Sequence, residues 1–241
     1  MRRMAWRIFK YIVHLFYRKH RKGHGIHSPY LFEFVNGVLF NAQRTKVPEA
    51  ILNEHQKLRS ENSFVRRSSV SRKYGSLLYR ITRWFQPEMI IELGTGVGIS
   101  SLYLASGSPE TPLHSIERDS ERAGLASRML DRYCPGSVTI HRGEMVEKLD
   151  ELLTRLQPRF LAFVDGNHHY EPTVSYVRTL LAKAGDEAMI VMDDIYWSRS
   201  MQRAWKEIIT WPEVRVSVDL FHMGILLLRK DLHKRKIKVK F

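Results

Sequence analysis

The stretch IIELGTGVGIS, residues 90–100, decides the fold. An apolar run leads into a turn that holds three glycines within five residues. These are Gly94, Gly96 and Gly98. Such a turn lets the chain reverse tightly and lets a ligand approach bare backbone near a helix N-terminus. Because Ile99 stands where a dinucleotide fingerprint has its third glycine, the pattern favours a nucleotide-type ligand other than NAD.

The next apolar run along the chain, LHSIE at residues 113–117, ends in Glu117. In nucleotide-binding parallel sheets, an acid at the end of the second strand accepts hydrogen bonds from the ribose hydroxyls. A glycine-rich turn or a single acid is common in proteins. Together and in this order they favour a nucleotide site over a simple structural turn.

Short apolar runs alternate with amphipathic helical segments from residue 87 onward. We expect strands at 89–93, 113–117, 138–142, 160–165, 189–194, 214–220 and 224–230, and helices near 99–107, 120–133, 145–157 and 171–184. This alternation predicts an α/β fold with a doubly wound, mostly parallel seven-stranded sheet. Only three residues join the last two runs, so these runs are predicted to form an antiparallel hairpin at the sheet edge.

The composition describes a globular chain of 241 residues, 44% of them hydrophobic. The apolar runs are too short to cross a membrane. The single cysteine, Cys134, can form no disulfide within the chain, which favours a reducing, cytoplasmic location, and we assign it no catalytic role.

The net charge of +14 is concentrated at the two ends of the chain. Residues 1–23 contain eight Lys or Arg and no acid, and residues 229–241 contain seven Lys or Arg and one acid. Residues 84–228 instead contain fourteen basic and twenty acidic side chains. This distribution argues against a whole-domain nucleic-acid surface and predicts an acidic core with basic appendages.

The N-terminal segment has apolar residues three and four apart, with Arg and Lys between them, which predicts a basic amphipathic helix. This helix has three possible uses. It is a membrane-surface anchor, it makes an Arg-rich contact to an anionic polymer, or its apolar face packs on the rest of the protein or on a second copy in a homodimer. We predict three parts: a basic helical extension at 1–70, a central domain at 71–230 and a basic tail at 231–241. Four basic residues lie just ahead of the central domain or at its start, and either face an anionic ligand or lie in a solvated loop. They are Arg66, Arg67, Arg72 and Lys73.

Residues 71–230 resemble the class I S-adenosylmethionine-dependent methyltransferases, whose fold is Rossmann-like. Glu92 with the three glycines matches the family's acid-x-Gly-x-Gly-x-Gly motif, and Glu117 matches its second-strand acid. The resemblance is stronger to the metal-dependent O-methyltransferase branch that includes catechol O-methyltransferase. In that branch a serine follows the glycine turn, as Ser100 does, and a segment before the first strand covers the cofactor, as SRKYGSLL with Tyr74 does by this resemblance.

The resemblance also implies which residues contact S-adenosylmethionine. Gly94 and Gly96 would approach its methionyl part and Glu117 its ribose. The loop after the third strand would contact its adenine; its residues are Gly143, Glu144 and Met145. Glu92, Gly98, Ser100, Tyr74 and Asp165 complete the predicted cofactor site.

Three acids follow two neighbouring predicted strands. Asp165 ends the fourth strand, and Asp193 and Asp194 end the fifth. Because the carboxyl ends of parallel strands meet at one edge of a sheet, these acids are predicted to converge and to suit Mg²⁺. The alternative is that Asp165 positions substrate or cofactor and that the other two cap the next segment.

The predicted catalytic residues are Asp165 and His168. In the resembling branch a metal lowers the pKa of the acceptor hydroxyl, and a Lys often stands where His168 does here. His168 is suited to act as a general base, although the adjacent His169 is also a candidate. Three aromatic residues beside the acids either wall a substrate pocket or pack in the core. They are Tyr170, Tyr196 and Trp197.

The sequence therefore predicts an enzyme that transfers a methyl group from S-adenosylmethionine to an oxygen of a small-molecule acceptor, with possible Mg²⁺ assistance. Two alternatives are a methyltransferase acting on RNA or DNA through the basic N-terminal region, and a non-catalytic cofactor-binding or membrane-surface module.

Overall fold

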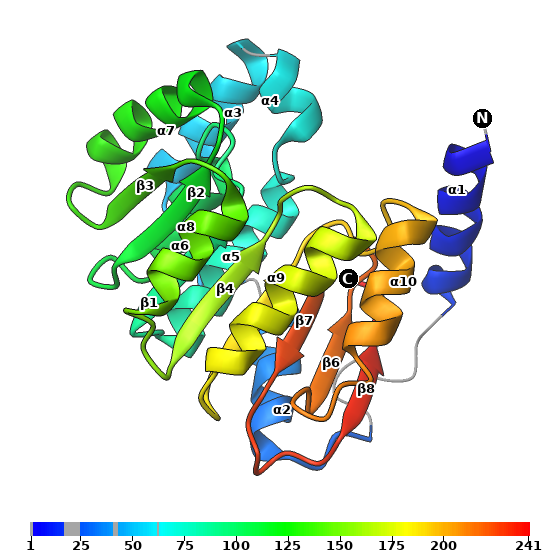
Figure 1. The fold of residues 1–241 in the computed structure, drawn as a ribbon. Coiled ribbons are helices and arrows are strands. Elements are labelled where there is room, and N and C mark those ends of the chain that lie inside the picture. The colour runs from blue at the N-terminus through cyan, green and yellow to red at the C-terminus, as the bar shows by residue number, and fades with distance from the viewer. Residues whose placement is uncertain (1, 17–24, 41–42, 62) are drawn as a thin grey trace. The chain divides into compact units, whose positions relative to one another are not determined.

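The computed structural model describes residues 2–16, 25–40, 43–61 and 63–241 (Figure 1). The chain divides into two compact units. The glycine-turn unit contains residues 41–157, and the hairpin unit contains residues 1–40 and 158–241. The predicted boundaries at residues 70 and 230 stay a prediction, and the described residues 2–16 and 25–40 group with the C-terminal third of the chain. The basic residues at 18–22 lie outside the described residues.

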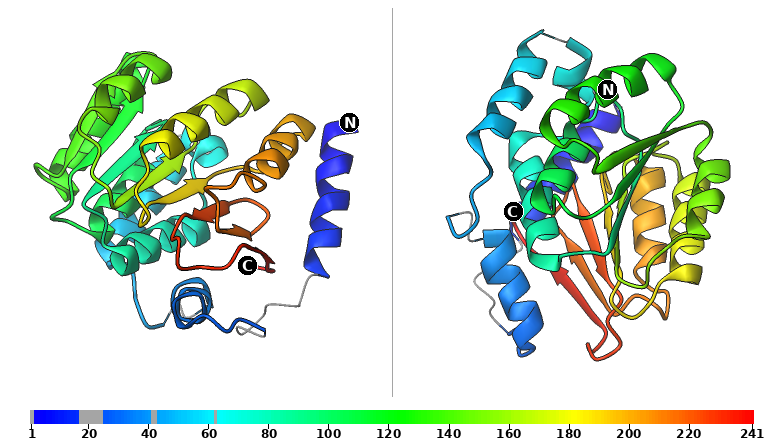
Figure 2. Two further views of the ribbon diagram at one scale, coloured as in Figure 1. Left: turned by 60° about the horizontal axis from the view of Figure 1, so that its bottom comes forward. Right: turned by 90° about the vertical axis from the view of Figure 1, so that its left-hand side faces the viewer.

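The glycine-turn unit contains three parallel strands in the order β3-β2-β1. They are β1 (Met89–Leu93), β2 (Leu113–Glu117) and β3 (Val138–Arg142), with the predicted bounds. Its helices are α3 (Glu49–Glu61), α4 (Ser63–Ser68), α5 (Arg72–Phe85), α6 (Ile99–Gly107), α7 (Ser120–Tyr133) and α8 (Met145–Leu153). Helices α5, α6 and α7 lie on one face of these strands and α8 lies on the other (Figure 2).

Helices α5 and α6 pack closely because Gly75 has no side chain. A Cβ atom at Gly75 would lie 2.4 Å from the ring of Tyr103, which is fully buried in α6. The hydroxyl of Tyr103 is 2.8 Å from Nδ1 of the buried His55 in α3. Three helices of this unit therefore meet at one aromatic ring.

The hairpin unit contains five strands in the order β4-β5-β7-β6-β8. They are β4 (Phe160–Val164), β5 (Met189–Met192), β6 (Val216–Asp219), β7 (Gly224–Leu227) and β8 (Arg235–Lys238). Strands β4 and β5 are parallel, and β7 is antiparallel to both β5 and β6, which confirms the predicted hairpin. The doubly wound, mostly parallel α/β class is also confirmed.

Strand β8 corrects the predicted strand number from seven to eight. It pairs in parallel with β6, in the segment that the sequence predicted to be a basic tail. Its basic side chains outnumber its apolar ones, but Ile237 and Val239 alternate with lysines, which is the two-residue period of a half-buried strand. The residues that hold it are buried: Leu232, Ile237 and Val239.

The helices of the hairpin unit are α1 (Arg2–Leu15), α2 (Pro29–Glu33), the π-helix η2 (Phe34–Phe40), α9 (Tyr170–Lys183) and α10 (Arg199–Ile208). Figure 2 shows α9 and α10 on one face of the strands and the helices of residues 29–40 on the other. Helix α10 was not predicted. Among the described residues, no helix has the length and apolar character needed to span a bilayer.

Candidate active site

The glycine turn after β1 has the conformation that its sequence predicts. Gly94, Gly96 and Gly98 all have positive φ angles, of 103°, 54° and 85°. A Cβ atom at Gly98 would lie 2.8 Å from Met129 in α7, so this glycine permits close helix packing. A Cβ atom at Gly96 would meet no atom within 4 Å, so the space over Gly96 is open to a ligand.

Glu117 lies beside this turn and its carboxylate is fixed by backbone. Its Oε2 accepts a hydrogen bond from Gly96 N–H at 2.8 Å, and its Oε1 accepts one from Asp119 N–H at 2.9 Å. The carboxylate has about four lone-pair positions. Two of these positions therefore remain for further donors, which is the number needed to accept from two ribose hydroxyls.

Glu92 lies below the turn and is completely buried. Its Oε2 accepts hydrogen bonds from Ser101 Oγ and, at 2.6 Å, from Ser115 Oγ. Its Oε1 has no hydrogen-bond partner among the described residues. Burial raises the pKa of Glu92 to about 7, although nearby serine hydroxyls oppose this shift. The side chain thus supports the turn from within the unit.

The remaining predicted cofactor residues of this unit lie in the loop after β3 and in the first turns of helices. Gly143 follows β3, and its N–H donates to the carbonyl of Glu117 at 3.2 Å. Glu144 is the N-cap residue of α8, and Met145 begins that helix. Ser100 is buried in the first turn of α6. Tyr74 is buried in α5, one turn after its N-cap.

The predicted catalytic pair lies after β4 in the hairpin unit. Nε2 of His168 is 3.7 Å from Oδ1 of Asp165. His168 and the preceding Asn167 both have positive φ angles, of 38° and 66°, and this turn aims the imidazole at the acid. The imidazole also lies near the ring of Trp197, with 6.2 Å between centroids. His169 is the exposed N-cap residue of α9, and its side chain makes no capping hydrogen bond. The geometry therefore favours His168 over His169 as the base.

Asp193 and Asp194 follow β5 but make different contacts. Asp193 N–H donates to the carbonyl of Val164 at 2.9 Å, which places it beside the end of β4. Burial and the neighbouring Asp194 carboxylate raise the pKa of Asp193 to about 8. Asp194 has a φ of 51°, and its Oδ1 lies 3.7 Å from the guanidinium of Arg7 in α1.

In this structure Asp165, Asp193 and Asp194 are not arranged as the predicted metal site. Across the part of the chain that the structure describes, no group of three His, Cys, Asp or Glu side chains is arranged to hold an ion. The Arg7 cation already neutralises part of the charge on Asp194. A divalent ion would have to displace it.

Arg7 is the residue of this site that the sequence did not identify. Its guanidinium lies 4.5 Å above the ring of Trp197 as well as near Asp194. It was one of several cations on a basic helix, and no local signal set it apart. Of the three aromatic candidates, Trp197 alone lies at the acids. Tyr170 bonds to Glu207 and Tyr196 donates to Asp219 at 2.8 Å.

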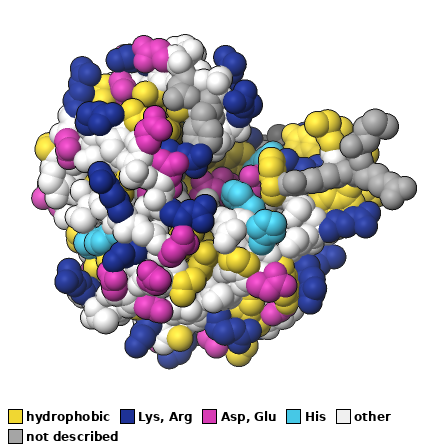
Figure 3. Space-filling view, turned by 45° about the horizontal axis from the view of Figure 1, so that its top comes forward, with side chains coloured by type: hydrophobic (Ala, Val, Ile, Leu, Met, Phe, Trp, Pro, Cys, Tyr) yellow, Lys and Arg dark blue, Asp and Glu magenta, His cyan; other side chains and the backbone are white. Residues whose placement is uncertain are grey.

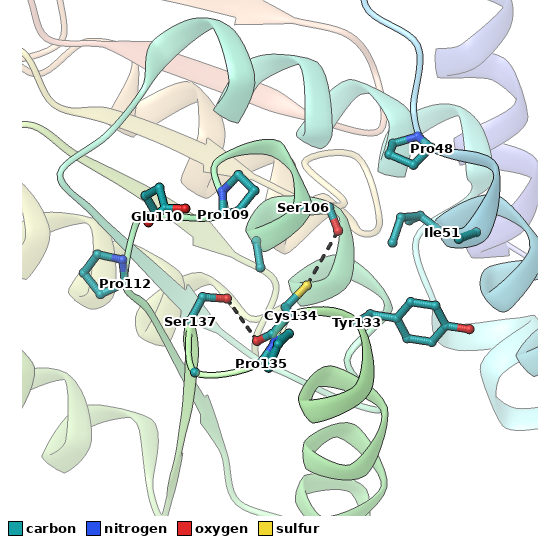
Figure 4. A pocket seen from close by; sticks show the side chains of 13 residues that line it. Pro48, Ile51, Ser106, Pro109, Glu110, Pro112, Tyr133, Cys134, Pro135 and Ser137 are labelled. Carbon is teal, nitrogen blue, oxygen red and sulfur yellow. Dashed lines mark hydrogen bonds between the residues drawn. The ribbon is translucent and has the colours of Figure 1, made fainter.

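A separate cavity of about 740 Å³ lies in the glycine-turn unit (Figure 4). Its lining includes Pro112 and Ser137, which precede β2 and β3, so it opens at the amino ends of the strands, opposite the glycine turn. Cys134 lines it, 3.6 Å from Ser106 Oγ. Burial raises the pKa of this thiol, which makes it a poor nucleophile. The cavity is therefore not the candidate active site.

Comparison with known proteins agrees with this geometry. Residues 91–195 match a family model described as a methyltransferase domain. A catechol O-methyltransferase of Niastella koreensis is 28% identical over 130 residues, which make up 53% of this chain and 58% of that protein. The chain thus spans less than two thirds of the length of this curated relative.

Two solved structures share the fold. A Podospora anserina methyltransferase with bound SAH has a TM-score of 0.66 and 17% identity, and the match covers 84% of this chain and 97% of that one. An O-methyltransferase of Streptomyces achromogenes, involved in tomaymycin synthesis and solved with SAM, has a TM-score of 0.63 and 23% identity, with 80% and 95% covered. Residues 91–195 therefore match the methyltransferase-domain model, and the chain has the Rossmann-like fold of these solved methyltransferases.

Proposed function

We propose that this protein transfers a methyl group from S-adenosylmethionine to an oxygen of a small-molecule acceptor. The observation that carries the proposal is the Glu117 carboxylate, which is held by Gly96 N–H beside a turn open to a ligand. The domain match and the cofactors of the structural relatives support it.

The glycine-turn unit binds the methyl donor in this proposal. The bare backbone at Gly94 and Gly96 accommodates its methionyl part, and the two lone pairs left on Glu117 accept from the ribose hydroxyls. The Gly143 hydrogen bond holds the adenine-binding loop next to Glu117. When bound, S-adenosylmethionine supplies a methyl group on a positively charged sulfur, which is a good leaving group.

The loop after β4 acts on the acceptor. His168 accepts the proton of the acceptor hydroxyl, and Asp165 orients the imidazole and stabilises the cation that forms. With the donor bound, the acceptor oxygen would take its methyl group, and sulfur would keep the electron pair of the broken carbon–sulfur bond. The products are the methyl ether and S-adenosylhomocysteine.

We assign these steps to side chains alone. The ion pair between Arg7 and Asp194 does not fit a three-carboxylate metal site, so we derive no step through a metal. The nucleic-acid alternative gains no support from the C-terminal cations. Several of them already have partners within the chain: Arg229 bonds Asp231, Lys230 pairs with Asp186, and Lys234 donates to the carbonyls of Thr210 and Trp211.

The cofactor site is tested by calorimetric titration of S-adenosylhomocysteine into wild type, Gly96→Ala and Gly136→Ala. The two glycines are matched, because both have positive φ and neither Cβ would meet an atom within 4 Å. Both variants therefore bear a similar backbone strain of roughly 1–2 kcal/mol. We expect about tenfold or more weaker binding by Gly96→Ala alone, because only its methyl group fills the ligand space.

Equal affinity of the two variants, or no binding by wild type, would remove the cofactor assignment. The acceptor class has a separate assay, in which methyl transfer from labelled S-adenosylmethionine to catechol is measured. Catechol is the probe because it is named for the curated relative. Intact cofactor binding without transfer would reject a catechol-type acceptor and leave the cofactor site standing.

A further inference from the structure

Helix α1 turns an apolar face outward. Five side chains on one side of the helix form this face, which we name the apolar stripe: Met4, Ile8, Phe9, Ile12 and Phe16. Their exposed fractions are 70%, 54%, 60%, 48% and 78%. In Figure 3 hydrophobic side chains gather over α1, at the right of the view. A single exposed apolar residue is ordinary, but a continuous stripe of this kind indicates a binding surface.

The opposite face of α1 holds the helix on the hairpin unit. Nε2 of the buried His14 lies 2.9 Å from the carbonyl oxygen of Val239. The ring of Tyr11 packs edge-on against Phe221 at 5.0 Å between centroids, and Arg7 lies over Trp197. Because the polar and aromatic face makes these contacts, the apolar stripe is left for a partner outside the described chain.

The charge of this segment favours a negatively charged partner. Residues 1–23 hold eight Lys or Arg and no acid. A second copy docked through the same stripe would bring two such segments together and repel itself. An anionic lipid surface would attract them, at about 1 kcal/mol for each basic residue near the surface.

The length of α1 determines how it would meet a bilayer. Its 14 residues extend about 21 Å, which is less than the roughly 30 Å hydrocarbon core. A helix with one apolar face and one face occupied by protein lies in the plane of the interface. Trp6 suits that depth, since the indole ring is apolar and its N–H can reach water.

We propose that α1 is an in-plane anchor that inserts the apolar stripe into an anionic lipid surface. This inference is independent of the proposed function. It states where the enzyme works, and binding is measured without any acceptor.

The test is flotation of the full chain with vesicles of equal parts phosphatidylcholine and phosphatidylglycerol, and with vesicles of phosphatidylcholine alone. The variants are Ile8→Asp in the stripe and Val146→Asp in α8, a matched control because both side chains are 54% exposed. We expect wild type and Val146→Asp to float with the anionic vesicles only. Binding of Ile8→Asp should fall about tenfold or more. The substitution replaces an aliphatic side chain that would insert into the lipid with a negative charge that the anionic lipid repels.

A second variant, Lys10→Gln, keeps the stripe and removes one charge. It should bind the anionic vesicles more weakly than wild type and with a smaller dependence on salt. Far-UV circular dichroism and S-adenosylhomocysteine titration establish that each variant is folded. Three results would overturn the proposal: no flotation of wild type, equal flotation of Ile8→Asp, or a lipid-free dimer that Ile8→Asp converts to a monomer. The last result would make the stripe an interface between copies.

Discussion

At the scale of single residues, Glu92 makes the stability of the protein depend on pH. Its pKa is raised to about 7, mainly by burial. Between the ordinary carboxyl pKa and about 7, the folded state keeps a proton that the unfolded state loses. The free energy of unfolding due to this group therefore falls as the pH rises through that range.

Glu92→Gln should remove this dependence. The amide oxygen can still accept from Ser101 and Ser115, and the side chain stays neutral. Relative to wild type, we expect the variant to gain about 2–3 kcal/mol between pH 4.5 and pH 8. The measurement is urea unfolding of both proteins across that range. The readout is the difference in unfolding free energy between the two proteins, because the contributions of groups that both share cancel in it. One such group is His55, whose pKa burial lowers to about 4 and which therefore titrates in the opposite sense. A constant difference would reject the raised pKa.

His168 and His169 provide a second comparison at this scale. Asn tolerates the positive φ of His168, so His168→Asn and His169→Asn should both fold. We expect kcat with catechol to drop about a hundredfold or more in His168→Asn, with the acidic limb of the pH profile lost, and to change little in His169→Asn. Similar rates for the two variants would remove His168 as the base.

Removal of metal ions tests whether the Arg7–Asp194 ion pair takes the place of a metal in the working enzyme. Because Arg7 occupies this carboxylate, we expect transfer to catechol to continue in EDTA at its full rate. If EDTA stops the reaction and Mg²⁺ restores it, the three acids act as metal ligands and Arg7 must move away from Asp194. Calcium in place of Mg²⁺ is the control for a general ionic effect.

The sequence predicted Glu117 and the glycines because their roles depend on local chain geometry. A tight turn with positive φ needs glycine, and an acid at a strand end has a fixed position relative to that turn. The contact of Arg7 with Asp194 joins residues far apart in the chain. Which cation of α1 meets Asp194 depends on how the helix packs, and no local sequence pattern encodes that packing.

At the scale of elements, the packing of α5 on α6 requires Gly75. Alanine is the better helix former by up to about 1 kcal/mol, but its Cβ would lie 2.4 Å from the Tyr103 ring. We expect Gly75→Ala to destabilise the protein by about 1–3 kcal/mol in urea unfolding, because the clash outweighs the propensity.

Gly124→Ala in α7 is the matched control. Its Cβ would meet only the end of Arg128, at an ordinary 3.7 Å. This variant should be as stable as wild type or more stable by up to about 1 kcal/mol. Stabilisation by both substitutions would mean that α5 and α6 are less tightly packed than the structure has them.

The elements were predicted mainly from short apolar runs. Strands β1, β2 and β3 have the expected bounds, whereas α10 was missed. Its signals are nevertheless present in the sequence. The Ser198 side chain accepts from Met201 N–H at 3.1 Å, and the buried residues Met201, Ala204, Trp205 and Ile208 have helical spacing. The preceding aromatic residues drew the interpretation toward a substrate pocket.

At the scale of the whole molecule, the uneven charge places cations on an exposed strand edge. Strand β8 is last in the order of its unit, and three of its four residues are Lys or Arg. An unpaired strand edge invites pairing with another chain, and exposed lysines discourage this. We expect Lys236→Val to leave the unfolding free energy nearly unchanged and to increase aggregation, followed by light scattering. Lys240→Val, exposed but outside the strand, should scatter like wild type.

The contact between His14 and Val239 joins residues 225 positions apart. It also determines when, during synthesis, α1 can dock. Helix α1 is made long before the backbone to which it bonds. Domains otherwise tend to fold as they emerge. The glycine-turn unit can do so, because all of residues 41–157 precede the final third of the chain. The hairpin unit must wait until Val239 has been made, with α1 and its apolar stripe made but not yet docked.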